Sequence, residues 1–223
     1  MPKERFYTDQ PLSPHAEITL TGDEAHHLFR VMRAKPGDTV ELINGKNVLA
    51  HATVKTNSLH IDSIETNQSN ATIILAQAIP RFNRLEYILE KCTELNVLEF
   101  WLFPGMLSEK TTFTDNQNQR MAHLLIAAMK QSGRLDLPTI HLKPPLSSWK
   151  FNKPLLFGDT SPLAPHITTL PKPHPSLIII GPESGFHPQE HTLLHAHGQG
   201  VKLSTNILRV DTAAIAATTL LGE

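Results

Sequence analysis

Cysteine, long hydrophobic runs and an apolar leader are what this sequence lacks. The chain has a single cysteine, Cys92, among 223 residues, which excludes an internal disulfide and a zinc site built from thiolates. Its longest apolar stretches, around residues 73–79 and 124–129, are far shorter than the roughly 20 residues that a membrane-spanning helix needs. Residues 1–5 continue into polar sequence, so we expect no secretory signal and a cytoplasmic protein.

An excess of charge of either sign is also missing. The 20 lysines and arginines nearly balance the 21 aspartates and glutamates, which gives a formal net charge of -1. Proteins that coat nucleic acid by bulk electrostatics usually have a strongly basic domain, so this class is disfavoured, although local basic patches are compatible with the sequence. Hydrophobic residues make up 40% and charged residues 18%, which excludes the composition of a disordered chain. The length then predicts one large or two modest domains.

The first third of the chain has the pattern of a small β-barrel. One helix is predicted over residues 23–32, and short strands are predicted over 18–20, 39–43, 48–56 and 58–64. Asn44-Gly45 predicts a type I′ hairpin turn, in which both central residues have positive φ. The polar, turn-rich segment 66–70 predicts a linker. We therefore expect a first domain over residues 1–68.

Residues 71–223 alternate between strand and helix patterns. Strands are expected over residues 73–78, 97–103, 155–157, 177–180 and 201–203. A helix is expected to begin at Asn83 with a capping box to Glu86, and the next covers 116–132 with Gly133 as its stop. Two more helices are expected over 188–196 and 211–221, and the proline-rich segment 162–175 predicts a surface connection. This alternation is typical of the α/β class, with a largely parallel sheet covered by helices.

A strand that ends in a glycine turn forms the first candidate site. Residues 177–190 read Leu-Ile-Ile-Ile-Gly-Pro-Glu-Ser-Gly-Phe-His-Pro-Gln-Glu. The two glycines leave bare backbone beside the start of a helix, where a ligand can approach closely. The loop has neither the Gly-x-x-x-x-Gly-Lys motif of triphosphate sites nor the Gly-x-Gly-x-x-Gly motif of dinucleotide sites, so both uses are disfavoured. An ordinary strand-to-helix turn is the alternative interpretation.

Two further segments place charged residues near helix ends. In residues 201–214 a buried strand is followed by a polar turn, then by Ile207-Leu208-Arg209 and a helix of small residues. Residues 130–134 read Lys-Gln-Ser-Gly-Arg, with Ser-Glu-Lys upstream at 108–110. Taken alone, Arg209 is a solvated arginine near a helix start, and residues 130–134 are a helix end with a favourable cation.

Thirteen histidines raise the question of a metal site. His187, His191 and His195 are spaced at i, i+4 and i+8 of a predicted helix, while His26-His27 lie on the N-terminal helix. Three stacked imidazoles can bind a metal ion. Because the region has no cysteine and no His-Glu-x-x-His pattern, we favour a partly exposed polar face and expect no metal.

Four short segments occur together in one known family. These are the Gly-Pro-Glu-x-Gly-Phe loop, the Ile-Leu-Arg-x-Asp-Thr-Ala run, Thr93-Glu94-Leu95, and Gln131-Ser132-x-Arg134. In their order and spacing the chain resembles the small-subunit ribosomal RNA uracil-N3 methyltransferases of the SPOUT class, over nearly its whole length. The resemblance implies an N-terminal PUA-like RNA-binding domain, and a methyltransferase domain with a C-terminal trefoil knot from about residue 71. It also implies a homodimer, for which the small-residue last helix is suited.

The resemblance further implies that S-adenosylmethionine binds in the loops after three strands near the chain end. Apolar side chains can sandwich its adenine ring, and backbone groups can bond the ring's edges. Carried over by position, the cofactor residues are Phe157, Ile180, Gly181, Pro182, Glu183, Gly185, Leu203, Ser204, Ile207 and Leu208. The chain departs from the family at five positions: Ser184 and Asn96 replace glycine, Lys130 and Asp211 replace glutamate, and Lys110 replaces arginine.

The implied reaction methylates N3 of a uridine in the decoding region, near the 3′ end of 16S rRNA. The sequence leaves open whether the substrate is free RNA or the assembled 30S subunit. Because N3 lies on the Watson–Crick edge, the base must be unpaired or turned out. The imide proton leaves as the nitrogen attacks, and charge spreads onto the carbonyl oxygens, where a cation helps. Arg209 is the candidate cation, and Glu183 is a candidate for a proton or positioning role. The candidates for gripping RNA are Arg30, Arg33, Lys35, Arg81, Arg84 and Arg134.

Two other functions stay open on the sequence. A SPOUT enzyme that acts on another RNA, such as transfer RNA, shares the cofactor and differs in its substrate. A non-catalytic RNA-binding protein with a decayed enzyme domain would not bind S-adenosylmethionine, so a titration with the cofactor separates it from both enzymes.

Overall fold

The computed structural model describes residues 4–151, 154–171 and 176–222, and the chain forms two compact units. The first unit is Met1–Ser69 with Met129–Leu137, and the second is Asn70–Ala128 with Pro138–Glu223. The sequence did not predict that residues 129–137 return to the first unit. Independent folding of the domains expected over 1–68 and 71–223 stays a prediction.

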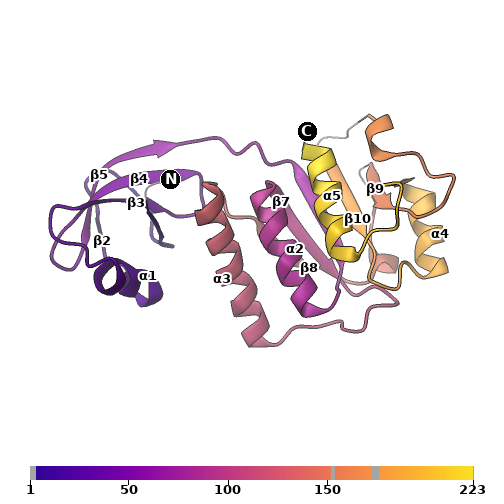
Figure 1. Ribbon diagram of the computed structural model, residues 1–223, viewed down its shortest axis with the longest axis horizontal. Coiled ribbons are helices and arrows are strands. Elements are labelled where there is room, and N and C mark those ends of the chain that lie inside the picture. Colours follow the sequence, from indigo (N-terminus) through magenta and orange to yellow (C-terminus); the bar gives the residue numbers. More distant parts are fainter. Residues whose placement is uncertain (1–3, 152–153, 172–175, 223) are drawn as a thin grey trace. The chain divides into compact units, whose positions relative to one another are not determined.

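The first unit is a five-stranded sheet with a short helical segment (Figure 1). Its elements are β1 (Arg5–Tyr7), β2 (Glu17–Ile18), α1 (Gly22–His26), the π-helical η1 (His27–Val31), β3 (Thr39–Ile43), β4 (Val48–Val54) and β5 (Leu59–Thr66). The strand order is β1-β3-β4-β5-β2, with β1 parallel to β3 and the other pairs antiparallel. A register shift at His51/Ala52 adds local twist to the sheet. Closure of this sheet into the expected barrel stays a prediction.

The connection between β3 and β4 differs from the predicted type I′ turn. Gly45 has a φ of 70° and Asn47 has a φ of 61°, whereas Asn44 is not among the residues with positive φ. The side-chain oxygen of Asn44 instead accepts a hydrogen bond from the backbone N–H of Lys46 at 3.0 Å. The prediction of a two-residue turn is therefore wrong, because the side chain of Asn44 closes a local turn and the loop is longer.

The C-terminal end of helix α3 (Asp115–Ser132) belongs to the first unit. Met129 and Leu135 are buried in one cluster with Ile43 and Leu49. Lys130 donates to both carboxylate oxygens of Glu24, at 2.6 and 2.9 Å. This pair accounts for a lysine at a position where the family has glutamate. The predicted stop of α3 is confirmed by Gly133, which has a φ of 80°.

The second unit is a six-stranded sheet in the order β11-β9-β10-β6-β7-β8, with all described pairs parallel. Besides α3, its elements are β6 (Ile73–Ala78), α2 (Phe82–Glu94), β7 (Val97–Phe103), β8 (Thr139–Leu142), η2 (Leu146–Ser148), β9 (Leu155–Gly158), η3 (Ile167–Thr169), β10 (Ser176–Ile180), α4 (Pro188–His197), β11 (Gln199–Val201) and α5 (Val210–Gly222). The α/β class and the parallel sheet predicted from the sequence are confirmed.

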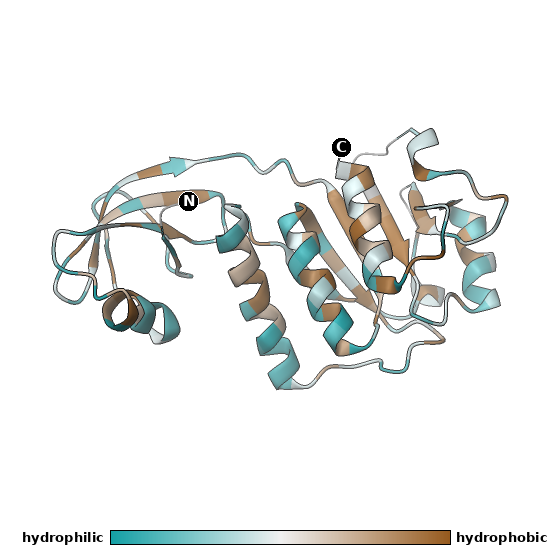
Figure 2. Ribbon diagram, in the orientation of Figure 1, coloured by the Kyte–Doolittle hydropathy of each residue, from teal (hydrophilic) through white to brown (hydrophobic). Residues whose placement is uncertain are grey.

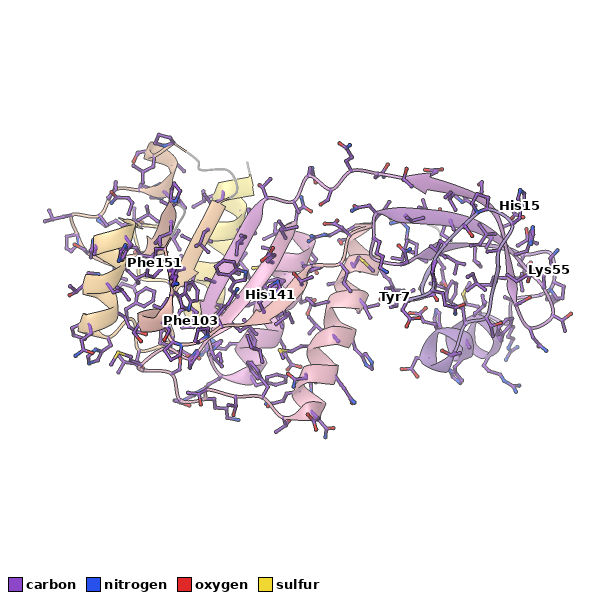
Figure 3. The ribbon with its side chains drawn as sticks, turned by 180° about the vertical axis from the view of Figure 1, so that it is seen from behind. Tyr7, His15, Lys55, Phe103, His141 and Phe151 are labelled. Atoms are coloured by element: carbon purple, nitrogen blue, oxygen red, sulfur yellow. The ribbon has the colours of Figure 1, made fainter. Side chains whose placement is uncertain are left out.

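The two faces of this sheet are covered by different helices. Helices α2 and α5 pack on each other, and between them they contact β7, β6 and β10. The opposite face carries Leu194 of α4 and the aromatic residues Phe103 and Phe151, which are labelled in Figure 3. The strands between these layers are mostly hydrophobic (Figure 2), as two-sided burial of a parallel sheet requires.

Helix α2 begins differently from the prediction. Its N-cap is Arg81, without a side-chain cap, so the capping box from Asn83 to Glu86 is wrong. The predicted buried face is present: Leu85, Ile88, Leu89 and Cys92 are fully buried. Burial raises the pKa of the Cys92 thiol to about 12, so this cysteine is a protonated core residue at neutral pH.

Several smaller features complete the comparison with the sequence. Strand β11 covers Gln199–Val201 rather than 201–203, because the backbone of Lys202 already bonds to residues 165 and 167. The expected surface connection 162–175 contains η3, whose Ile167 is buried, and its residues 172–175 lie outside the described ranges. Asn96 has a φ of 68°, a conformation that asparagine tolerates where the family has glycine. Across the described ranges, we find no helix that combines the length and the apolar character needed to cross a bilayer.

Candidate functional site

The carboxyl ends of three neighbouring strands in the second unit surround a cavity of about 680 Å³. Because β10 and β11 both pair in parallel with β9, their C-terminal loops emerge at one edge of the sheet. The cavity is lined by residues 158–160, 180–186 and 201–210, together with Arg84, His191 and Ala213. Ligands of α/β sheets bind at this edge, and small-molecule pockets usually measure about 300–1,000 Å³. The cavity is therefore the candidate site.

The glycine loop after β10 forms one wall of the cavity. The backbone N–H of Gly185 donates to the carbonyl of Pro182 at 2.9 Å, which closes a tight turn. Gly185 has a φ of 76°, and a Cβ on Gly181 would lie 3.4 Å from the ring of Phe186. The turn needs glycine at 185 for its conformation, whereas glycine at 181 lets Phe186 pack against the backbone.

The glycine loop is held by contacts from the neighbouring strand β6 and from the start of α4. Gln77 is fully buried, and its side-chain N–H group donates to the carbonyls of Ile180 and Gly181 at 3.4 and 3.2 Å. At the start of α4, the side chain of His187 accepts from the backbone of Gln189, and Glu190 accepts from the backbone of His187. The sequence analysis did not identify Gln77. The one signal for it in the sequence is a polar residue within an otherwise apolar strand.

The second wall of the cavity, residues 201–210, combines apolar side chains with polar ones such as Ser204, Thr205 and Asn206. Ile180, Leu203, Ile207 and Leu208 all line the cavity, and Ile207 is 84% exposed. An exposed isoleucine in a cavity wall provides apolar surface that a bound ligand would cover.

Nine of the ten predicted cofactor residues line this cavity, and Phe157 does not. Phe157 is fully buried behind the wall, with its ring edge-on to Phe186 at a centroid distance of 6.2 Å. The next residues, Gly158, Asp159 and Thr160, line the cavity instead. Phe157 therefore supports the site from the core, because the strand turns its side chain into the sheet layer.

A chain of charged residues includes three that line the cavity, Arg84, Glu183 and Arg209. The Glu183 carboxylate accepts from the backbone N–H of Arg81 at 3.1 Å and pairs with Arg84 at 3.4 Å. Arg84 also pairs with Asp211 at 3.4 Å, and Asp211 lies 3.6 Å from Arg209. Arg84, predicted to grip RNA, is thus a cavity residue that holds two carboxylates.

Arg209 is the more available of the two cationic side chains. Its side chain is 69% exposed and makes one long ion pair within the part of the chain that the structure describes, whereas the side chain of Arg84 is 23% exposed. The backbone of Arg209 is fixed, since its carbonyl accepts from Ala213 at 2.7 Å in the first turn of α5. A cation on a fixed backbone with a loosely held guanidinium can reach a substrate beside the cavity.

The other predicted RNA-binding residues fall into separate places. Arg30, Arg33 and Lys35 are exposed together on the first unit, in η1 and the turn that follows. Arg81 is exposed on the second unit and forms a two-pronged hydrogen bond with Glu109, which lowers the pKa of that carboxyl.

Arg134 differs from these exposed residues. Its side chain is 6% exposed and pairs with Asp136 at 2.8 Å, inside the first unit. A guanidinium in this position stabilises the first unit and has little surface available for contact with RNA.

Comparison with known proteins agrees with this geometry. Residues 67–222 match the RNA methyltransferase domain family, and residues 20–62 match the RNA methyltransferase PUA domain family. Ribosomal RNA small subunit methyltransferase E of Synechocystis sp. is 30% identical, over 91% of this chain and 71% of that protein. The enzyme of the same name from Bacillus subtilis is 26% identical, over 94% of this chain and 91% of its own.

Two solved structures share the fold. A putative methyltransferase from Legionella pneumophila, in complex with S-adenosylmethionine, has a TM-score of 0.82 and 25% identity, and covers 99% of this chain and 97% of its own. Ribosomal RNA small subunit methyltransferase E from Neisseria gonorrhoeae, bound to S-adenosylmethionine, has a TM-score of 0.81 and 25% identity, with coverage of 97% and 95%.

Proposed function

This chain belongs to the RNA methyltransferase family, and from that premise we propose that it methylates N3 of a uridine in 16S rRNA, in the decoding region near the 3′ end. It is an S-adenosylmethionine-dependent methyltransferase of small-subunit ribosomal RNA: the relatives it matches are named ribosomal RNA small subunit methyltransferase E, and one solved structure of that name holds S-adenosylmethionine. The observation that carries the proposal is the placement of the glycine loop 181–186 and Arg209 around one cavity.

The residues around the cavity fit S-adenosylmethionine. Gly181 and Gly185 leave backbone uncovered on one side, and Ile207 offers an exposed apolar surface for the adenine ring on the other. Ser184 does not have positive φ, so the turn accepts a serine where the family has glycine. When bound, the cofactor supplies an electrophilic methyl group.

Arg209 is the proposed catalytic cation. As N3 of the uracil loses its proton, negative charge spreads onto the two neighbouring carbonyl oxygens. The guanidinium of Arg209, with its planar set of donors, can bond one of these oxygens or the target phosphate. Its high exposure and its single long ion pair leave its donors available for this contact.

We assign Glu183 a positioning role rather than that of a proton acceptor. Its carboxylate is held by the backbone N–H of Arg81 and by the guanidinium of Arg84. The same contacts fix the glycine loop relative to the start of α2.

RNA contact is proposed for two exposed basic segments. Arg30, Arg33 and Lys35 lie within the region that matches the PUA domain family, and they would contact phosphates without reading sequence. Arg81 is the corresponding candidate on the second unit, where the substrate would have to displace its exposed pair with Glu109.

The C-terminal trefoil knot is also a proposal, and hydrogen bonds beside β11 support it. The backbone N–H of Lys202 donates to the carbonyl of Pro165 at 2.8 Å, and Ile167 donates back to the carbonyl of Lys202 at 2.9 Å. These bonds hold the loop after β9 against the chain where it leaves β11. The chain then continues into α5, which packs on β6 and β10. A chain threaded through that loop would make these contacts.

We further propose a homodimer that acts in the cytoplasm on the 30S subunit. Ala214, Ala217 and Thr218 of α5 are buried within their own chain, so a partner would contact the half-buried face that includes Ile215 and Leu220. Light scattering of the purified protein measures the dimer directly, and a monomer at micromolar concentration would contradict it.

Mapping of methylated uridines tests the proposed target. We expect 3-methyluridine to disappear from one position of 16S rRNA when the gene is deleted, and to return when the wild-type gene is supplied. Its loss from transfer RNA instead would favour the alternative substrate. An unchanged methylation pattern in both RNAs would contradict the proposed activity.

A further inference from the structure

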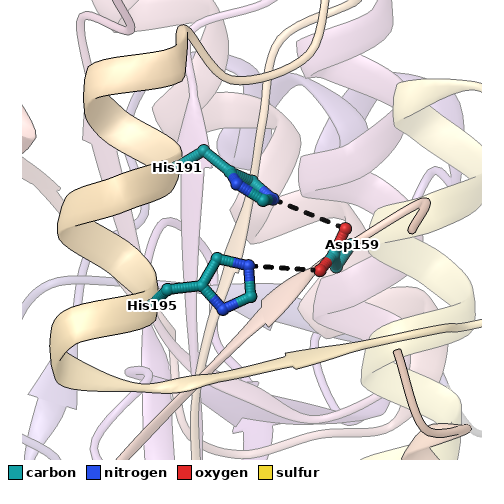
Figure 4. Close-up of side chains that lie close together, drawn as sticks. All are labelled: Asp159, His191 and His195. Atoms are coloured by element: carbon teal, nitrogen blue, oxygen red, sulfur yellow. Dashed lines mark ion pairs between the residues drawn. The ribbon is translucent and has the colours of Figure 1, made fainter. Parts of the chain in front are cut away.

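Three side chains beside the cofactor cavity converge on one point (Figure 4). Asp159 follows β9, while His191 and His195 lie one turn apart on α4 and point toward it. Nε2 of His191 is 3.5 Å from one carboxylate oxygen of Asp159, and Nε2 of His195 is 3.4 Å from the other. The possible ligand atoms of the three residues all lie within 4.8 Å of one another.

The carboxylate of Asp159 is held in place by the backbone around it. Its side chain is 5% exposed, and one oxygen accepts from the backbone N–H of Ser161 at 2.8 Å. The N–H of Asp159 itself donates to the carbonyl of Val201 at 2.9 Å. A Cβ on Gly200 would lie 2.6 Å from the other oxygen, so the glycine in β11 makes room for this carboxylate. Such outer contacts orient metal ligands in proteins.

The spacing suits a small divalent ion. Zinc binds imidazole nitrogen at about 2.0–2.1 Å and carboxylate oxygen at about 2.0–2.2 Å, so neighbouring ligand atoms of a tetrahedral site are about 3.3–3.5 Å apart. The two nitrogen–oxygen distances, 3.5 and 3.4 Å, fall in that range, and each imidazole faces a different oxygen of Asp159. A donor set of two imidazoles and one carboxylate favours zinc and related transition metals over magnesium or calcium.

We propose that Asp159, His191 and His195 bind a divalent transition-metal ion, with zinc as the best fit, and that a further position of the ion is open to water. Because Asp159 and His191 also line the cavity, the ion would tie α4 to the end of β9 beside the cofactor loops. The sequence grouped His187 with the two other histidines and favoured a polar face without metal, because the region has no cysteine and no His-Glu-x-x-His pattern. His187 caps α4 instead, and Asp159 takes the third place. This site does not depend on the proposed methylation.

Titration of the full-length protein with Zn²⁺ alone, after removal of metal by chelation, tests the site. Calorimetry should show one equivalent bound, and Co²⁺ should give the visible absorption of a low-coordinate ion. His191→Gln and His195→Gln should each weaken binding at least about tenfold, because each removes one ligand. His197→Gln is the matched control: it changes a histidine of the same helix that stacks on Phe151 outside the site, and it should bind zinc like the wild type.

A second measurement keeps the test independent of any one variant. At a zinc concentration one hundred times the wild-type Kd, zinc should raise the melting temperature by roughly 5–10 °C in the wild type and in His197→Gln, and by no more than about half as much in His191→Gln. Gly200→Ala should reduce both effects by displacing Asp159. Equal zinc affinity in the wild type and both ligand variants, or no binding at about 100 μM zinc, would overturn the proposal and leave the three residues as an ion-pair cluster.

Discussion

Gly181 and Gly185 shape the cavity in different ways. Gly185 supplies the positive φ of the turn, whereas Gly181 has open van der Waals space that ends at the ring of Phe186. A methyl group at 181 would make an ordinary contact with that ring. A larger branched side chain would push Phe186 and the turn at Gly185 out of the cavity wall.

We predict that Gly181→Val weakens S-adenosylmethionine binding by roughly tenfold or more, which is about 1.4 kcal/mol of binding free energy. Gly181→Ala is the matched control and should bind within a few-fold of the wild type. Calorimetric titration of both folded variants measures the difference. If valine leaves the affinity unchanged, this loop is not part of the cofactor site.

Single residues also show where sequence reasoning ended. The glycine loop could be predicted as a candidate site because its residues are contiguous and its two glycines leave the backbone bare, while the resemblance to the family implied that it binds the cofactor. Asp159 was missed, since it meets His191 and His195 through the pairing of β9 with β11 and the packing of α4. No sequence motif predicts such a cluster, because Asp159 is far from the two histidines in the sequence.

At the scale of elements, the segment after α3 is held by the ion pair between Arg134 and the half-buried Asp136. Burial alone would raise the pKa of Asp136, but hydrogen bonds from Arg134 and Ser69 outweigh it and hold that pKa below its usual value. The segment also pairs with Lys46 of the β3–β4 loop through a β-bridge. A carboxylate with a lowered pKa stabilises the fold above its unfolded pKa and loses that contribution as the pH falls through the folded value.

We therefore predict that Asp136→Asn lowers the free energy of unfolding by about 2 kcal/mol at pH 7, as expected for a hydrogen bond to a charged group. The loss should shrink as the pH falls below about 4, where the unfolded-state aspartate becomes protonated. Urea unfolding at pH 7 and pH 3 measures both values, with the exposed Asp9→Asn as control. An equal loss at the two pH values would contradict the role of this charge.

Strands were predictable where both faces of the sheet are buried. β6 and β7 match the expected strands to the residue, because continuous apolar runs of that length fit a covered parallel sheet. The edge strand β8 was missed because its residues are mostly exposed, and exposed edges carry a weaker pattern. The predicted turn at Asn44 was wrong because the side chain of Asn44 bonds the backbone of Lys46. The predicted start of α2 was wrong because the helix begins at Phe82, after Arg81.

At the scale of the whole molecule, the two units do not divide at a single point in the sequence. A linker at 66–70 was predictable from its polar composition, but the return of residues 129–137 was not, because a helix pattern does not report which unit its last turn joins. Every residue of the cofactor cavity belongs to the second unit.

We predict that a fragment of residues 71–223 binds S-adenosylmethionine with affinity near that of the full chain and loses most of its affinity for RNA. Without the first unit, Met129 and Leu135 lose their packing partners, so the fragment should be more prone to aggregate. Replacing both with polar residues should correct this. Calorimetry and RNA filter binding measure the two affinities, and full methylation by the fragment would refute this division of labour.

The central claim is that Arg209 is the catalytic cation beside the cavity at the carboxyl ends of β9, β10 and β11. Its most direct test is single-turnover methylation of 30S subunits at saturating S-adenosylmethionine. We predict that Arg209→Ala keeps the fold and most of the cofactor affinity but reduces the rate by on the order of 10² to 10³, and that Arg209→Lys recovers part of it without the planar donor set. A wild-type rate for Arg209→Ala would contradict the account and return this residue to a solvated surface charge.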